Sequence, residues 1–195
     1  LSDITERLRR EFATSDFEPC DFELSIRRDG DVKPFTLELK KGTVQIRGVI
    51  DRVDKMDLDG KRFIRVVDYK TGGKTFELSD VLEGLNMQML LYLISIWRNG
   101  EGEYGNIIPA GILYFPAKMS TVNVDSRGDD EALRRENRYR AGKMNGMIVD
   151  DYDMVSHMDK QGKGLFIPVS ADKRTGKIKG KFISLYHLEK LGERM

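Results

Sequence analysis

The most informative stretch of this sequence is VVDYKTGG, residues Val66–Gly73. An apolar run leads into an aspartate and a lysine one residue apart, and two glycines follow. On a β-strand, residues two apart face the same side, so Asp68 and Lys70 project together while Tyr69 points to the other face. Taken alone, the pattern also fits a strand end with a solvated ion pair.

The turn before this strand favours a more specific arrangement. Asp59-Gly60 is typical of a two-residue β-hairpin, because both central residues of such a turn need positive φ. With the turn centred there, Leu58 faces Lys61, and Asp51 lies directly opposite Asp68. Facing side chains of a hairpin have Cβ atoms about 5 Å apart, so the two carboxylates repel each other unless a cation lies between them.

These oxygen ligands, without nitrogen or sulfur, predict Mg²⁺ or Mn²⁺ rather than zinc. Lys70 would stand beside the ion, where an ammonium group can stabilise a developing negative charge or position a water. Gly72-Gly73 would let the chain leave the sheet beside a bulky substrate, although a plain turn is the better explanation of the pair taken by itself.

The same register sets Asp54 opposite Arg65 on the other face of the hairpin. We interpret Asp54 as a structural cross-strand partner rather than a metal ligand. Arg52 falls on that face beside Val67, and its role is open.

Composition restricts the protein class. The 195 residues are 39% apolar and 33% charged, which is typical of one globular domain. A single cysteine, Cys20, rules out an internal disulfide, and no cysteine–histidine cluster has zinc spacing. The net charge is +1, but residues 160–181 carry seven Lys or Arg against one acid, Asp172. That stretch would suit phosphates or a solvated loop about equally well.

Hydrophobic periodicity predicts a mixed α/β architecture, with antiparallel strands, then a helix, then another strand. The predicted strands are Phe22–Arg27, Phe35–Leu39, Thr43–Asp54, Phe63–Lys70, Ala110–Phe115 and Leu165–Val169. The predicted helices are Ser2–Glu11, Asp80–Arg98, Asp129–Lys143 and Ser184–Met195.

The helix after the acidic strand adds two candidate residues. Gln88 and Tyr92 are four apart and share one face, with Gly84 one turn earlier. Tyr92 alone would be interpreted as a core aromatic, but beside the acids this pair could hold a phosphate or an attacking water. Glu23 is a possible further acid near the site, or an exposed strand residue.

Three motifs resemble the RecB-like branch of the PD-(D/E)XK nucleases: GVIDRVD (48–54), VVDYKTG (66–72) and QMLLY (88–92). The resemblance implies a restriction-endonuclease-like core, with a mixed central sheet flanked by helices, and Mg²⁺- or Mn²⁺-dependent hydrolysis of DNA. It also implies the site residues. These are Asp51 and Asp68 with the carbonyl of Tyr69 as metal ligands, Lys70 as the catalytic lysine, and Gln88 and Tyr92 lining the site.

Several longer segments are most similar to the C-terminal nuclease domain of the AddB family, one of the two chains of bacterial AddAB helicase–nucleases. These segments are FEPCDFELSI (17–26), EGLNMQMLLYL (83–93), AGILYF (110–115) and GKMNGMIVDDYDMVSHMD (142–159). The likeness implies an AddA-type partner, a DNA exonuclease role in double-strand-break repair, and the bacterial cytoplasm.

Two departures from the family pattern stand out. RecB-like nucleases usually carry a histidine on a helix upstream of the first strand, whereas His157 and His187 lie far downstream. AddB proteins also hold a 4Fe–4S cluster with four cysteines, and Cys20 does not match any of them. We therefore expect a fragment of a larger protein, with a core of about residues 20–116 and a truncated family-specific extension over 117–195, in one nuclease domain.

Two other functions stay open. A catalytically inactive nuclease fold could serve as a DNA-binding scaffold, although such copies usually lose an acid or the lysine. Another RecB-like nuclease, such as a CRISPR adaptation nuclease or a phage exonuclease, would share the chemistry. No Walker-type phosphate loop occurs, so ATP use belongs elsewhere in any parent complex.

Overall fold

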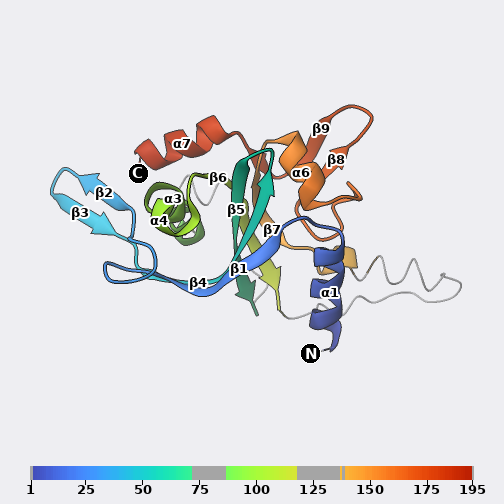
Figure 1. Ribbon diagram of the computed structural model, residues 1–195, viewed down its shortest axis with the longest axis horizontal. Coiled ribbons are helices and arrows are strands. Elements are labelled where there is room, and N and C mark those ends of the chain that lie inside the picture. The colour runs from blue at the N-terminus through green and yellow to red at the C-terminus, as the bar shows by residue number, and fades with distance from the viewer. Residues whose placement is uncertain (1, 72–86, 118–136, 138, 195) are drawn as a thin grey trace, which may run out of the picture.

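The computed structural model of the chain describes residues 2–71, 87–117, 137 and 139–194. In this part of the chain, a mixed six-stranded sheet with the order β1-β4-β5-β6-β7-β10 forms the centre (Figure 1). Its strands are β1 (Glu18–Ile26), β4 (Gly48–Leu58), β5 (Lys61–Lys70), β6 (Ile107–Pro116), β7 (Asn145–Val149) and β10 (Phe182–Ile183). The predicted α/β fold class, a mixed central sheet flanked by helices, is confirmed.

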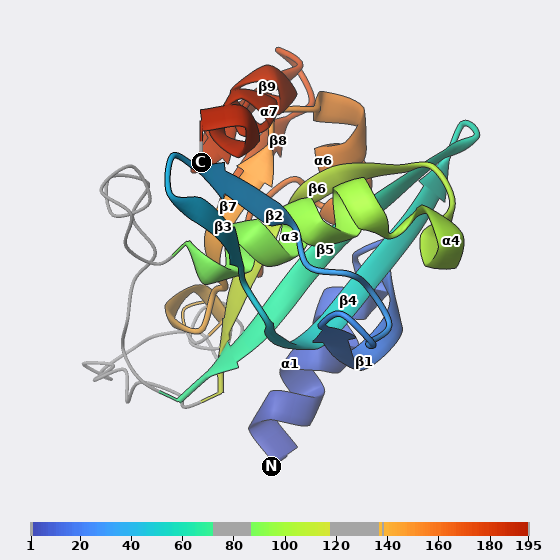
Figure 2. The same ribbon diagram turned by 90° about the vertical axis from the view of Figure 1, so that its left-hand side faces the viewer.

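Helices cover both faces of this sheet. They are α1 (Ser2–Ala13), α3 (Gln88–Asn99), α4 (Glu101–Tyr104), α6 (Tyr152–Met158) and α7 (Leu185–Arg194). Helix α3 crosses one face, and α1 lies on the opposite side (Figures 1 and 2). Two small hairpins project from the sheet: β2 (Thr36–Leu39) with β3 (Gly42–Gln45), and β8 (Val169–Asp172) with β9 (Lys177–Gly180).

The β4–β5 hairpin has the predicted register. Asp59 and Gly60 both have positive φ, 49° and 74°, as the tight turn requires. Leu58 faces Lys61, Asp54 faces Arg65, and Arg52 faces Val67. Because the turn fixes the register, it fixes which side chains of these two strands share a face.

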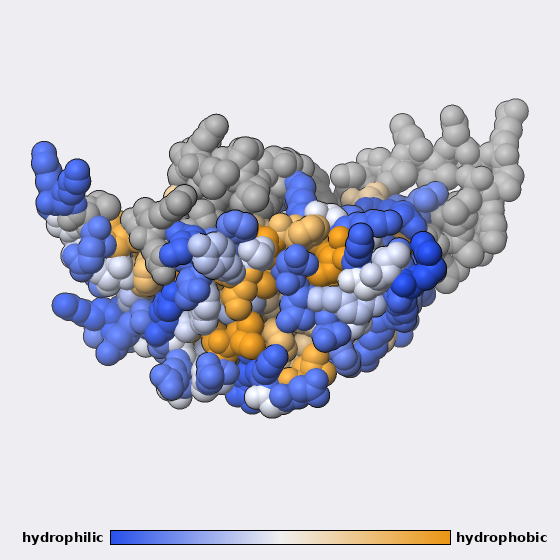
Figure 3. Space-filling view, turned by 90° about the horizontal axis from the view of Figure 1, so that it is seen from above, coloured by the Kyte–Doolittle hydropathy of each residue, from blue (hydrophilic) through white to orange (hydrophobic). Residues whose placement is uncertain are grey.

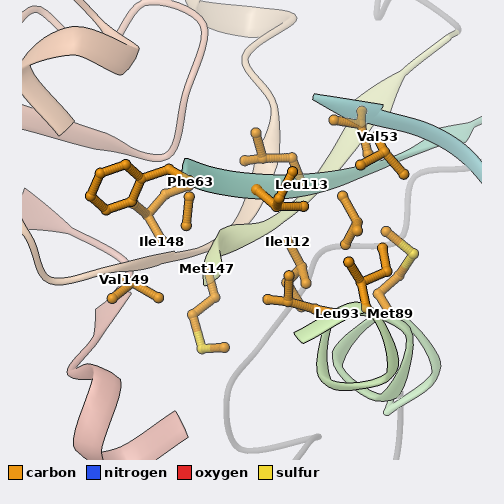
Figure 4. Packing of buried hydrophobic residues seen from close by; sticks show 14 of the residues in the cluster. Val53, Phe63, Met89, Leu93, Ile112, Leu113, Met147, Ile148 and Val149 are labelled. Carbon is orange, nitrogen blue, oxygen red and sulfur yellow. The ribbon is translucent and has the colours of Figure 1, made fainter. Parts of the chain in front are cut away.

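Strand β6 pairs with β5 in parallel, so the chain must cross over between them, and α3 belongs to that crossover. The core lies between α3 and the sheet, where Met89 and Leu93 point toward Val53, Ile112 and Met147 (Figure 4). All of these side chains are at least 97% buried. Burial of this apolar layer fixes α3 against the strands that carry the predicted acids.

The prediction of one long strand over Thr43–Asp54 was wrong. Strand β3 ends at Gln45 and pairs with β2, whereas β4 begins at Gly48 and pairs with β1. The predicted strand Leu165–Val169 was also wrong, because the regular strand β8 begins only at Val169. Pro168 precedes it and has no N–H to donate to a ladder.

Other predicted elements match more closely. The first and last helices are confirmed, as α1 and α7. The predicted helix Asp80–Arg98 is observed from Gln88 onward. Its residues 80–86, like most of the predicted helix Asp129–Lys143, lie outside the described residues. Strand β7, helix α6 and strand β10 were not predicted, and β7 and β10 extend the central sheet from the segment 117–195.

Seen from the side that carries α7 and the β8–β9 hairpin, the surface is mostly hydrophilic, with separate apolar groups between the charged residues (Figure 3). Within the described ranges, no helix is both long and apolar enough to cross a membrane.

Candidate active site

Asp51, Asp68 and Lys70 come together at the end of the β4–β5 hairpin. Lys70 Nζ lies 2.6 Å from Asp68 Oδ2, with side-chain exposures of 41% and 20%. The main-chain N–H of Tyr69 donates to Asp51 Oδ2 at 2.7 Å. One oxygen of Asp51 therefore lies against the main chain directly after Asp68, so the two residues lie close to each other along adjacent strands.

Regular strand pairing stops at this point. The last facing pair of β4 and β5 is Arg52 with Val67. Two residues further along β5, the N–H of Tyr69 donates to the Asp51 carboxylate. A carboxylate thus occupies the space between the strands where a ladder would continue. This arrangement holds the Asp51 side chain in place without using its second oxygen.

The other face of the hairpin carries a buried charge cluster, made of Glu11, Arg52, Asp54 and Arg65, whose side chains are at most 3% exposed. Arg65 Nε donates to Asp54 Oδ2 at 2.8 Å and Arg65 Nη2 donates to Glu11 Oε1. Arg52 Nη2 donates to Asp54 Oδ2 at 3.1 Å, and Arg52 Nη1 donates to the Tyr69 hydroxyl at 2.9 Å.

Two arginines and two carboxylates balance in this cluster, which satisfies the condition for burying charge. Asp54 is therefore a structural partner of Arg65, as predicted. Arg52, whose role was open, links Asp54 to the side chain of Tyr69. The Tyr69 side chain thus lies with the cluster, on the face opposite the Asp68–Lys70 pair.

The two candidate residues on α3 contact each other. Gln88 Nε2 donates to Tyr92 Oη at 2.6 Å, and Tyr92 is only 2% exposed. A Cβ atom placed on Gly48 would lie 1.7 Å from Tyr92 Oη. The tyrosine hydroxyl therefore rests against the main chain of β4, three residues before Asp51, in space that only a glycine leaves open.

Tyr114 is a neighbour of the acids that the sequence analysis missed. In the parallel pairing of β5 and β6 it is the partner of Asp68, and its ring lies 5.7 Å from Lys70 Nζ. Burial and the charge of Asp68 raise the pKa of the Tyr114 hydroxyl to about 12. Only the register between two strands far apart in sequence reveals this contact; the segment AGILYF alone does not.

Glu23 lies on β1 next to Asp51, because its neighbours Phe22 and Leu24 face Arg52 and Ile50. It is exposed and has a φ of 53°, an uncommon conformation for a residue other than glycine. The pairing thus places the main chain of Glu23 next to that of Asp51, but among the described residues the Glu23 side chain does not form a three-acid group with Asp51 and Asp68. Gly72-Gly73 and Gly84 lie outside the described residues.

The remaining candidate ligands are engaged elsewhere. Cys20 Sγ donates to the carbonyl of Val53 at 3.4 Å, and burial together with Asp21 and Asp54 raises the pKa of this thiol to about 12. His157 Nδ1 lies 2.7 Å from Asp16 Oδ2, and His187 Nδ1 lies 2.7 Å from Ser184 Oγ. Neither histidine stands in for the upstream histidine of RecB-like nucleases.

The donor set at the end of the hairpin fits a hard divalent cation. Two carboxylates against one ammonium leave a deficit of positive charge, and the buried Asp68 Oδ2 has Lys70 Nζ as its ion-pair partner. Among the described residues, no group of three or more His, Cys, Asp or Glu is arranged to hold a metal. A metal here would therefore draw on main-chain carbonyls and water besides Asp51 and Asp68.

Comparison with known proteins places this geometry in a family. Residues 1–161 match the family described as the PD-(D/E)XK nuclease superfamily. Relatives named as B subunits of an ATP-dependent helicase/deoxyribonuclease come from Acetivibrio thermocellus (34% identical over 174 residues, 87% of this chain) and Clostridium acetobutylicum (37% over 167 residues, 84% of this chain). The chain spans only 15% and 14% of the length of these two relatives. This chain belongs to the PD-(D/E)XK nuclease superfamily.

Proposed function

We propose that this chain is the nuclease domain of an AddB-type helicase–nuclease protein and cleaves DNA phosphodiester bonds with Mg²⁺ or Mn²⁺. The observation that carries the proposal is the meeting of Asp51 with the main chain of Tyr69, next to the Asp68–Lys70 pair. The similarity to helicase/deoxyribonuclease chains supports it. In this proposal the domain acts as an exonuclease in double-strand-break repair in the bacterial cytoplasm, with an AddA-type helicase–nuclease as partner.

Each site residue has a separate task. Asp51, Asp68 and the carbonyl of Tyr69 hold the metal, which when bound supplies Lewis-acid polarisation of the phosphate and an activated water. Lys70, held 2.6 Å from Asp68, donates to the oxygen on which negative charge develops. Gln88 and Tyr92, hydrogen-bonded to each other, orient a phosphate or water above β4.

Metal binding is the sharpest test, because it does not depend on any other part of a larger complex. Calorimetric titration with Mn²⁺ should show binding that is lost in both Asp51→Asn and Asp68→Asn. Asp57→Asn is the matched control, since Asp57 is an exposed acid of the same strand that pairs with Arg62. Binding that survives both site variants, or falls equally in the control, would refute the assignment.

Cleavage of a labelled single-stranded oligonucleotide completes the test. Lys70→Met should keep Mn²⁺ binding and lose about 100-fold or more in cutting rate, because it removes a group that stabilises transition-state charge. If the chain binds Mn²⁺ and DNA without cutting, the scaffold function is favoured instead.

A further inference from the structure

A cavity of about 380 Å³ lies outside the metal site. Three segments line it: the residues before β7, the loop after α6, and the β8–β9 hairpin. Among the described residues that line it, four are cationic and none is acidic: Arg140, Lys143, Lys163 and Lys179. We call this cavity the basic pocket.

Hydrogen bonds from main-chain N–H groups to a buried carboxylate fix the conformation of one wall of the basic pocket. The buried carboxylate of Asp159 accepts from the N–H groups of Gln161 at 3.1 Å and Gly164 at 2.7 Å, which fixes the loop that carries Lys163. Gly164 has a φ of 60°, and a Cβ there would lie 2.5 Å from the carbonyl of Val169. The loop therefore packs closely on strand β8, which fixes the position of the main chain that carries Lys163.

The register of the sheet relates the basic pocket to the metal site. Asp68 on β5 faces Tyr114 on β6, and Tyr114 faces Asn145, the first residue of β7. Adjacent strands are about 4.8 Å apart, so the main chain of Asn145 lies about 10 Å from that of Asp68 along the edge of the sheet. Lys143 comes two residues before Asn145, and Met144 N donates to the carbonyl of Phe166 at 2.8 Å. The basic pocket therefore lies next to Asn145, at the end of the row formed by Asp68, Tyr114 and Asn145.

The chemistry of the basic pocket favours a phosphodiester backbone. Its lysines are exposed and solvated, and cations of this kind contribute affinity mainly by releasing the counterions of successive phosphates. Asp172, the acid on the same hairpin, faces Lys177 and lies outside the lining. Ser170 and the main chain of Gly180 add hydrogen-bonding groups. Such groups can bind phosphate oxygens whatever the base sequence of the DNA.

We propose that the basic pocket binds the backbone of the DNA strand a few nucleotides from the phosphate at the metal site. The choice of DNA as the ligand rests on the proposed nuclease function. The pocket would hold the strand in register with Asp51 and Asp68 without reading its bases.

Fluorescence anisotropy with a labelled oligo(dT) in EDTA tests the basic pocket separately from catalysis. Lys163→Glu and Lys179→Glu should each weaken binding several-fold at low salt. Each should also lower the slope of log K against log salt by about 0.7, the value for one phosphate contact on a single strand. Lys61→Glu is the matched control, because Lys61 is an exposed lysine at the turn end of β5, nine residues from Lys70.

The proposal is overturned if both pocket variants bind like the parent chain, or if Lys61→Glu weakens binding as much as they do. It is also overturned if the variants lose affinity for poly-glutamate but not for oligo(dT), since an acidic protein segment would then be the ligand. Cutting in Mn²⁺ is measured on the same variants. If binding depends on the pocket lysines but no cutting occurs, the proposed nuclease function is refuted and the DNA-binding role of the basic pocket stands. If cutting occurs but binding does not depend on these lysines, the nuclease function stands and the role of the pocket is refuted.

Discussion

Of the glycines that the structure describes, Gly48 has the least room for a side chain. We expect Gly48→Ala to destabilise the chain by about 1–3 kcal/mol, because the new methyl group overlaps Tyr92 Oη and forces α3 or β4 to shift. Urea denaturation followed by circular dichroism measures the free energy of unfolding. The control is Gly102→Ala, where a Cβ meets no atom within 4 Å and should be neutral or stabilise by up to about 1 kcal/mol. Equal losses at the two positions would contradict the steric explanation.

Single residues also show where sequence reasoning succeeds. Asp68 and Lys70 could be predicted to share a face, because the two-residue period of a strand is local. The close approach of Tyr92 to Gly48 could not, since it depends on how a helix forty residues later packs on β4. Tyr114 was missed for the same reason: its place beside Asp68 follows from a parallel pairing that no local pattern encodes.

At the scale of secondary-structure elements, the buried charge cluster holds α1 against the β4–β5 hairpin. Glu11→Ala should destabilise the chain by about 3–5 kcal/mol, because Arg65 would keep its burial and lose one of its two carboxylate partners. Urea denaturation again provides the measurement. Glu6→Ala is the control on the same helix.

Glu6 is 40% exposed and pairs with Arg9 and Arg10 of the same helix. Its replacement should cost less than about 1 kcal/mol, as for other surface ion pairs. A Glu11 variant as stable as the Glu6 variant would mean that apolar packing, not charge, holds α1 in place.

Elements differed in how far the sequence specified them. The β4–β5 hairpin was predictable with its register because Asp59-Gly60 allows one tight turn. The division between β3 and β4 was not, because both segments alternate in the same way and only their different partners, β2 and β1, separate them. Strand β7 was missed because its five residues, NGMIV, include a glycine and show no alternation.

At the scale of the whole molecule, ion pairs, turn N–H groups and burial shift the pKa values of several groups away from their ordinary values. Partial burial alone would raise the pKa of Asp16, but the ion pairs with Lys160 and His157 outweigh it and lower that pKa. The pKa of Asp172 is lowered by N–H groups of its own turn. On the basic side, burial raises the pKa values of Cys20 and Tyr114 to about 12, from ordinary values of 9.0 and 10.0.

These shifts predict a stability plateau with two sloping ends. Carboxylates with lowered pKa values stabilise the fold above their ordinary pKa of 3.8, and that contribution is lost as the pH falls below it. Cys20 and Tyr114 keep protons in the folded chain that the unfolded chain releases, so stability should also fall as the pH rises from about 9 toward about 12. The urea midpoint measured across this range should show both slopes.

Two variants separate the two ends of the stability profile. Cys20→Ala should make the alkaline slope shallower and leave the acidic slope unchanged. Asp16→Asn should make the acidic slope shallower and leave the alkaline slope unchanged. A midpoint that stays constant from about pH 9 to about pH 11 in the parent chain would mean that neither buried group keeps its proton in the folded state.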